Sequence, residues 1–222
     1  MRIFECDGII VVMEKKKVKR LNLTIKSDGI FLSVPTYVSY TEAEDFLKSR
    51  LDWIKKHLEN MPQKKEMKYL SGDKISILGK EYALNVFYSK RKKKGEIIGE
   101  NVFIYAKNPD DFAIRKKAFT DFCAKVLSEN VPEIFERYET LLGVKASGVK
   151  FRAMKSRWGS CNVRKKEIHL NSLLALHPYR CLEYVVMHEL AHLIEPSHNE
   201  RFKAVMTAFM PDWRERRKVL NE

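Results

Sequence analysis

The sequence predicts an α+β fold in which a β-rich N-terminal half packs on a helix-dominated C-terminal unit. Up to Tyr105 the chain consists mostly of short alternating apolar runs separated by turn residues, a pattern typical of strands. From Phe112 onward the apolar residues recur mainly at helical spacing. A length of 222 residues with 45% hydrophobic residues is enough for one large domain or two small ones with buried cores.

The first segments of the chain predict a β-hairpin followed by a helix. Apolar and polar residues alternate over Lys19–Ile25, Ser27–Gly29 supplies a turn, and Ile30–Pro35 resumes an extended run. Thr41–Asn60 has apolar residues at helical spacing, and Glu44 stands where a capping box with Thr41 needs it. We therefore expect one helix of about 18 residues after the hairpin.

Short strands return after this helix and end at a change in the character of the chain. The expected strands are Lys74–Leu78, Tyr82–Tyr88 and Asn101–Tyr105, with glycines between them. Asn108 begins a cluster of turn and helix-capping residues, so we place a domain boundary there. This divides the chain into a β-rich region, residues 1–108, and a region of mostly helical pattern, residues 109–222.

The second region predicts two main helices with extended segments between them. Phe112–Leu142 has a long helical pattern that we expect to be interrupted near Pro132, because proline removes a helical hydrogen bond. Gly148–Met154 and Glu167–Asn171 read as extended segments. Helical spacing resumes at Tyr179 and is expected to stop at Pro196.

Composition and charge restrict the partners and the location of the protein. Lys and Arg number 42 against 29 Asp and Glu, a net charge of +13 that attracts nucleotides, nucleic acid or acidic peptides. No apolar run approaches the roughly 20 residues needed to cross a bilayer, so no membrane partner is expected. The 4 cysteines have no paired spacing, and no secretion signal is evident, which favours reduced thiols and a cytoplasmic location.

The residues that indicate chemistry lie in the final large helix, at His188-Glu189-Leu190-Ala191-His192. Four residues of helix turn by about 400°, so His188 and His192 share one face and are able to bind the same tetrahedral ion. Glu189 lies about 100° further round, where its carboxylate serves as the general base for metal-activated water. A solvated surface helix is the alternative interpretation, but the flanking residues are almost all apolar, and buried polar groups need compensation by a metal.

A third metal ligand is needed, and His198 is the favoured residue. Pro196 is expected to turn the chain so that His198 returns over the ion, leaving a fourth position for water. Glu195 is the main competitor as third ligand, followed by a carboxylate from the distal segment. A metal bound by three imidazoles is expected to be zinc, one ion per chain, although other divalent ions remain compatible.

The motifs resemble those of the YgjP-like predicted metallohydrolases, relatives of the SprT-like and WLM-type zinc peptidase domains. The resemblance rests on four segments: Ser156–Cys161, Ile168–Asn171, Glu183–Leu193, and His198 with Phe202. It implies a zincin-like catalytic unit with His188, His192 and His198 as zinc ligands and Glu189 as catalytic acid and base.

The resemblance also implies a substrate and a way of binding it. In zincins generally, an edge strand before the active helix pairs with an extended substrate, and Glu167–Asn171 is the matching segment. A peptide or protein substrate follows, which makes the protein a metallopeptidase. Arg157 and Arg201 are candidates for stabilising negative charge in the transition state, with a structural ion pair as the alternative for each. The basic charge keeps two other functions open: a metal-dependent nucleoside triphosphate pyrophosphohydrolase, and a non-catalytic module that associates with nucleic acid.

Overall fold

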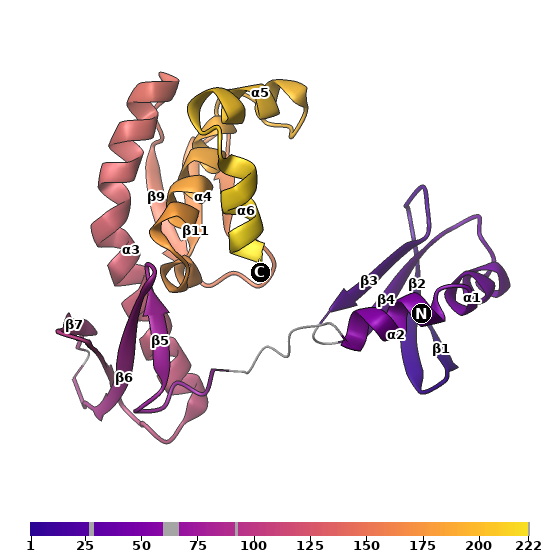
Figure 1. Cartoon of the computed structure of the whole chain (residues 1–222), viewed down its shortest axis with the longest axis horizontal. Helices are drawn as coiled ribbons and strands as arrows, with labels where there is room; N and C mark the ends of the chain where they lie inside the picture. Colours follow the sequence, from indigo (N-terminus) through magenta and orange to yellow (C-terminus); the bar gives the residue numbers. More distant parts are fainter. Residues whose placement is uncertain (27–28, 60–66, 92, 222) are drawn as a thin grey trace. The chain divides into compact units, whose positions relative to one another are not determined.

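The structure is a computed structural model that describes residues 1–26, 29–59, 67–91 and 93–221. The chain divides into two compact units, Met1–Glu66 and Met67–Glu222, each with its own hydrophobic core. Both units combine helices with β-sheet, which confirms the predicted α+β fold (Figure 1). None of the described helices has the length and apolar content needed to cross a membrane.

The division between the units differs from the boundary predicted near Asn108. The strands that follow Met67 belong to the second unit, where Ile75, Leu84 and Ile104 are buried in the same core as the long helix α3 (Phe112–Leu142). The sheet and the helix bury each other's apolar faces, so a change from strands to helices does not mark a domain boundary here.

A four-stranded sheet forms the first unit together with two helices. Its strand order is β1–β2–β4–β3, with the central pair β2 and β4 parallel and the outer pairs antiparallel. The predicted hairpin is confirmed as the antiparallel pair β3 and β4, while Ser27 and Asp28 of its turn lie outside the described residues. The strands are β1 (Arg2–Cys6), β2 (Ile9–Lys16), β3 (Asn22–Lys26) and β4 (Gly29–Pro35).

The single helix predicted in this unit is wrong, because the chain forms two helices, α1 (Tyr40–Lys48) and α2 (Leu51–Glu59). The break lies at Ser49, whose hydroxyl donates to the carbonyl of Phe46 and so competes with continued helical bonding. Asn60, where the helix was expected to end, lies outside the described residues.

The capping box of α1 also differs from the one predicted. It joins Ser39 and Glu42 in place of Thr41 and Glu44: the backbone N–H of Glu42 donates to Ser39 Oγ, and that of Ser39 donates to the Glu42 carboxylate. Both pairs have the residue types and spacing of a capping box, so the sequence pattern alone does not separate them.

The second unit begins with a sheet covered by α3. Its order is β5–β6–β8–β7, and β8 contacts α3. The helix is continuous through Pro132, so the predicted interruption is wrong. The lost hydrogen bond costs about 3 kcal/mol, which is offset by burial of large side chains on both sides of Pro132, such as Leu127 and Ile134. The strands are β5 (Lys74–Ile77), β6 (Lys80–Tyr88), β7 (Glu96–Ile98) and β8 (Asn101–Ala106).

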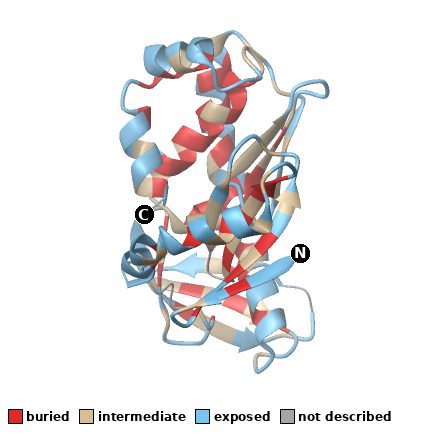
Figure 2. Cartoon of the chain, turned by 90° about the vertical axis from the view of Figure 1, so that its right-hand side faces the viewer, coloured by how far each residue is buried: buried red, intermediate tan, exposed pale blue. Residues whose placement is uncertain are grey.

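A second, three-stranded sheet and the last helices complete this unit. The strand order is β10–β11–β9, so β11 is the central strand and β10 lies at the edge. Helix α4 contacts this sheet as well as α3, α5 and α6, and most of its residues are buried (Figure 2). The elements are β9 (Gly148–Arg152), β10 (Gly159–Asn162), β11 (Glu167–Asn171), a short 3-10 helix η1 (Ser172–Leu176), α4 (Tyr179–Ala191), α5 (Glu200–Phe209) and α6 (Trp213–Asn221).

Candidate metal centre

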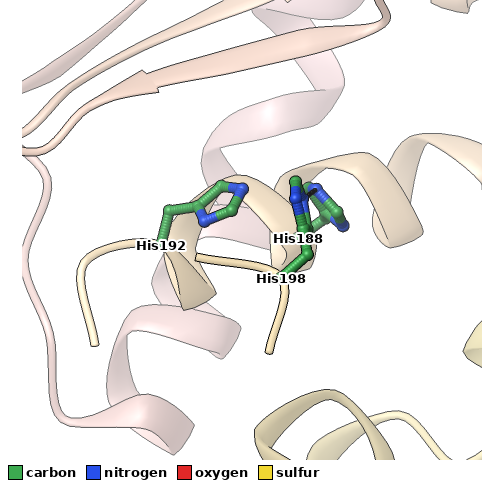
Figure 3. Close-up of side chains that lie close together, drawn as sticks. All are labelled: His188, His192 and His198. Carbon is green, nitrogen blue, oxygen red and sulfur yellow. Dashed lines mark hydrogen bonds between the residues drawn. The ribbon is translucent and has the colours of Figure 1, made fainter. Parts of the chain in front are cut away.

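Three histidines come together at the C-terminal end of α4 (Figure 3). His188 lies in the last turn of the helix, His192 is its C-cap, and His198 precedes α5. One ring nitrogen from each residue lies within 4.8 Å of the other two, and the Nε2 atoms of His188 and His198 are 3.0 Å apart. Two imidazole nitrogens that share a tetrahedral Zn²⁺ stand about 3.3 Å apart. The spacing therefore fits one shared divalent cation.

The protonation of His188 and His192 also suits a metal. Burial, followed by the neighbouring charges of His192, His198 and Arg217, lowers the pKa of His188 to about 3. Burial likewise lowers the pKa of His192, whose Nδ1 lies 3.1 Å from the carbonyl oxygen of Glu195. Since a carbonyl only accepts, Nδ1 of His192 carries the proton and Nε2 keeps its lone pair. Metal binding requires neutral imidazoles of this kind.

The turn after α4 explains how His198 returns to the helix. α4 ends at Ala191, before the predicted stop at Pro196, and the N–H groups of Leu193 and Ile194 donate to carbonyls three residues earlier. These bonds tighten the last turn and let the chain reverse.

Glu195, the competing third ligand, is placed differently from the three histidines. Its carboxylate accepts the backbone N–H of Ser197, and its backbone carbonyl orients the ring of His192. Among the residues that the structure describes, the group that could hold an ion consists of His188, His192 and His198.

A buried aromatic ring supports the three imidazoles. Phe202, which is 2% exposed, has its ring centroid 4.8 to 4.9 Å from those of His188, His192 and His198. The N-cap of α5 fixes its position, because the side chain of Asn199 accepts the backbone N–H of Phe202. The sequence singled out Phe202 as part of a motif without indicating this packing role.

Glu189 lies beside the histidines and is 5% exposed. Burial raises the pKa of its carboxyl to about 8, against the opposing effect of the nearby Arg157 guanidinium. A carboxyl in this position binds and releases a proton near neutral pH, as a general base requires. The structure thus brings Glu189 and the three histidines together.

The strand β10 passes close to the Glu189 side chain at Gly159. A Cβ atom on Gly159 would lie 2.5 Å from Oε1 and 2.7 Å from Cγ of Glu189. Any larger residue must displace the carboxylate, since these distances are below van der Waals contact.

We therefore expect Gly159→Ala to reduce turnover about 100-fold while the protein keeps its metal, because a catalytic group moved by about 1 Å loses much of its effect. Steady-state kinetics and metal analysis test this. The matched control is Gly148→Ala in the same sheet, where an added Cβ meets nothing within 4 Å. Equal activity of the two variants would contradict the importance of this contact.

Asn171 fixes the loop that leads into β10. The side chain, 3% exposed, donates to the carbonyls of Met154 (2.9 Å) and Arg157 (3.1 Å), and its Oδ1 accepts the N–H of Leu173 (3.2 Å). The loop carrying Arg157 is thereby tied to the end of β11, next to the metal site.

Replacement of Asn171 by alanine is expected to lower the free energy of unfolding by about 2 to 3 kcal/mol, because buried backbone groups lose their partners. Urea unfolding followed by circular dichroism measures this change. The exposed Asn162→Ala is the control, with an expected change within about 0.5 kcal/mol. A similarly small effect for Asn171→Ala would show that the loop is held by other contacts.

An open cavity of about 440 Å³ exposes the site to substrate. It is lined by the three histidines and Glu189, by residues of β10 with the loop before it, and by the end of α6, where Arg217 lies. Arg157, a predicted site residue, lines this cavity. Arg201 is exposed on α5 and is not among the lining residues, so the structure does not bring it to the site. Arg217 was not predicted, because its α6 segment reads as a solvated basic helix.

The strand that borders the cavity is not the one predicted to pair with the substrate. Glu167–Asn171 forms β11, which is paired on both sides, with β10 and β9, and therefore has no free edge. The prediction that it pairs with substrate is wrong, and β10 is the edge strand that borders the cavity. Periodicity alone cannot tell an edge strand from a central one, since both show the same two-residue repeat.

The chain was compared with protein families, with curated proteins and with solved structures. A family model described as YgjP-like, metallopeptidase domain, matches residues 19–222. No curated protein matches the chain. Among solved structures, the metallopeptidase zymogen of Pyrococcus abyssi abylysin is similar at 23% identity and a TM-score of 0.35. The match covers 39% of this chain and 87% of the abylysin chain. The metallopeptidase zymogen of Methanocaldococcus jannaschii jannalysin is similar at 20% identity and a TM-score of 0.37, covering 41% and 88%.

Proposed function

Because the chain belongs to the YgjP-like family of metallopeptidase domains, we propose that it is a zinc-dependent peptidase with one Zn²⁺ per chain. His188, His192 and His198 would hold the ion. The observation that carries the proposal is the convergence of three imidazole nitrogens within 4.8 Å of one another, beside a buried carboxylate, in an open cavity. Family membership supports the coarser conclusion of a metal-dependent hydrolase.

The residues around the ion have separate roles in the proposed reaction. A bound Zn²⁺ supplies Lewis acidity, which lowers the pKa of water to about 7 and polarises the scissile carbonyl. Glu189 would accept a proton from the attacking water and pass it to the leaving amine, a role that its position beside the three histidines in the cavity supports. Arg157 lines the same cavity, where its guanidinium adds positive charge near the bond to be cleaved, either for the carbonyl oxygen or for a group of the substrate beside it.

The edge strand β10 provides a place for an extended peptide. Its residues Gly159–Asn162 pair with β11 on one side only, and Gly159, Ser160 and Cys161 line the cavity on the way to the metal site. A peptide that adds to this edge gains backbone hydrogen bonds and is guided across Glu189. This arrangement favours a peptide bond as the target.

Nucleotide hydrolysis is the second candidate, and the pocket arginines are the observation that favours it. Arg157 and Arg217 both line the cavity, and guanidinium groups bind phosphates as readily as carboxylates. The net charge of +13 is also compatible with a module that associates with nucleic acid. Steeply salt-dependent binding to DNA or RNA would indicate that function.

One panel of substrates separates these functions. The wild type and Glu189→Gln are both loaded with zinc and incubated with a mixed peptide library and with nucleoside triphosphates. We expect peptide cleavage by the wild type only. Hydrolysis of triphosphates but no peptide by the wild type would replace the peptidase proposal with the nucleotide one.

The proposed location is the cytoplasm. All four cysteines are free thiols in the structure, and Cys123 and Cys181 are buried. Unpaired cysteines are typical of proteins in reducing compartments. Fractionation of cells that express the tagged protein tests this location.

A further inference from the structure

Arginine side chains line the cavity at the three histidines and a neighbouring hollow beside β10. A second hollow shares Ser160, Cys161 and Val163 with the first, and it is also lined by Arg152 and Arg164. Together the two hollows have four arginines among their lining residues, Arg152, Arg157, Arg164 and Arg217, whereas Glu189 is the one acidic residue. The cavity that holds Glu189 thus has two arginines, Arg157 and Arg217, beside its single carboxylate.

Arg157 and Arg217, the two arginines that line the cavity at the three histidines, are not held in ion pairs within the described residues. Within the part of the chain that the structure describes, the side chains of Arg157 and Arg217 make no ion pair. Arg216, the neighbour of Arg217 on α6, pairs with Glu183 at 2.6 Å and with Asp212 at 2.8 Å. In the same helix, Arg216 thus stabilises the fold through ion pairs, whereas Arg217 lines the cavity.

Arg157 and Arg217 reach the cavity from different elements. Arg157 comes from the loop before β10, which Asn171 ties down through the Arg157 carbonyl. Arg217 comes from α6, near Tyr184 and His188, whose ring centroids are 5.7 Å apart. The two arginines therefore line, from different elements, the same cavity as the histidines and Glu189.

We propose that Arg157 and Arg217 bind a carboxylate of the peptide substrate beside the scissile bond, so that the enzyme selects acidic peptides. This inference rests on the proposed peptidase function. Guanidinium groups form paired, charge-assisted hydrogen bonds with carboxylates. An arginine that is in no ion pair within the protein is able to form these bonds with a ligand. The carboxylate comes either from an Asp or Glu side chain or from the C-terminus of the peptide.

The test uses three peptides that differ in one group: an amidated peptide with Glu next to the cleaved bond, the same peptide with Gln, and the Gln peptide with a free C-terminus. Binding to zinc-loaded Glu189→Gln protein is measured by fluorescence anisotropy, and kcat/KM is measured with the otherwise wild-type protein. A charge-assisted hydrogen bond of about 1.5 to 3 kcal/mol predicts a preference of about 10- to 150-fold for a carboxylate peptide over the amidated Gln peptide. Preference for the first peptide assigns a side-chain carboxylate, and preference for the third assigns the C-terminus.

Four substitutions and one double variant assign the preference to its residues. Arg217→Gln and Arg157→Gln should each reduce it, and the double variant should abolish it. Arg214→Gln removes the same charge from an α6 residue that does not line the cavity, and it should leave the preference unchanged. Arg217→Glu should favour the same amidated peptide with Lys in place of Glu.

Two results would overturn the inference. Equal binding of all three peptides, or equal effects of Arg214→Gln and Arg217→Gln, would contradict carboxylate recognition, whether or not peptides are cleaved. The proposed function fails separately, if no peptide is hydrolysed by the zinc-loaded wild type. The binding measurement decides the inference even then, because it does not depend on cleavage.

Discussion

Replacing Glu189 with glutamine is expected to reduce peptide turnover by about 10²- to 10⁴-fold and to leave the metal content unchanged. Glutamine has the same shape as glutamate, but it neither accepts nor donates the transferred proton. The three histidines are unaltered, so the ion should remain. Steady-state kinetics and elemental analysis of the same preparation measure both effects.

The control for this variant is Glu200→Gln, an exposed residue of α5 that pairs with Lys203. It removes the same charge away from the cavity and should retain wild-type turnover. If Glu189→Gln kept full activity, Glu189 would not be the base. If it lost the metal, the carboxylate would be part of the metal site and the division of roles proposed here would be wrong.

Replacing His192 with alanine is expected to weaken zinc binding by about 100-fold or more, since loss of a residue that only supports a ligand already costs about 10- to 100-fold. The wild type should gain stability when zinc is added, by about 2.7 kcal/mol at a zinc concentration 100 times its Kd. His192→Ala should gain almost none at the same concentration. Thermal unfolding with and without zinc measures the difference.

A histidine outside the cluster provides the comparison. His57 of α2 stacks on Trp53 in the first unit, and His57→Ala should keep the full zinc-dependent gain in stability. Equal gains for His57→Ala and His192→Ala would mean that zinc stabilises the protein elsewhere. The ligands proposed here would then need to be replaced.

The convergence of the three histidines was the feature most open to prediction from sequence, because its geometry is local. His188 and His192 are four residues apart at the end of one helix, and His198 follows after one short reversal, so helix geometry and a single turn bring all three together. Glu189 is placed by the same helix. The family was also recognisable from these motifs, and the family match confirms it.

The features that sequence reasoning missed depend on contacts between distant segments. Arg217 lines the cavity because α6 packs on α4, and Gly159 meets Glu189 because β10 also packs on α4. Neither arrangement leaves a periodic signal. The domain boundary was misplaced for the same reason, since the sheet after Met67 is held by contacts with α3 that lie far along the chain.

The central claim is that His188, His192 and His198 share one divalent cation, and diffraction at the zinc absorption edge from crystals grown with zinc tests it most directly. The account predicts one anomalous peak about 2.0 to 2.1 Å from a ring nitrogen of each histidine, with Glu189 nearby but not bound. A peak elsewhere, or a zinc ion that binds fewer than these three imidazoles, would contradict it.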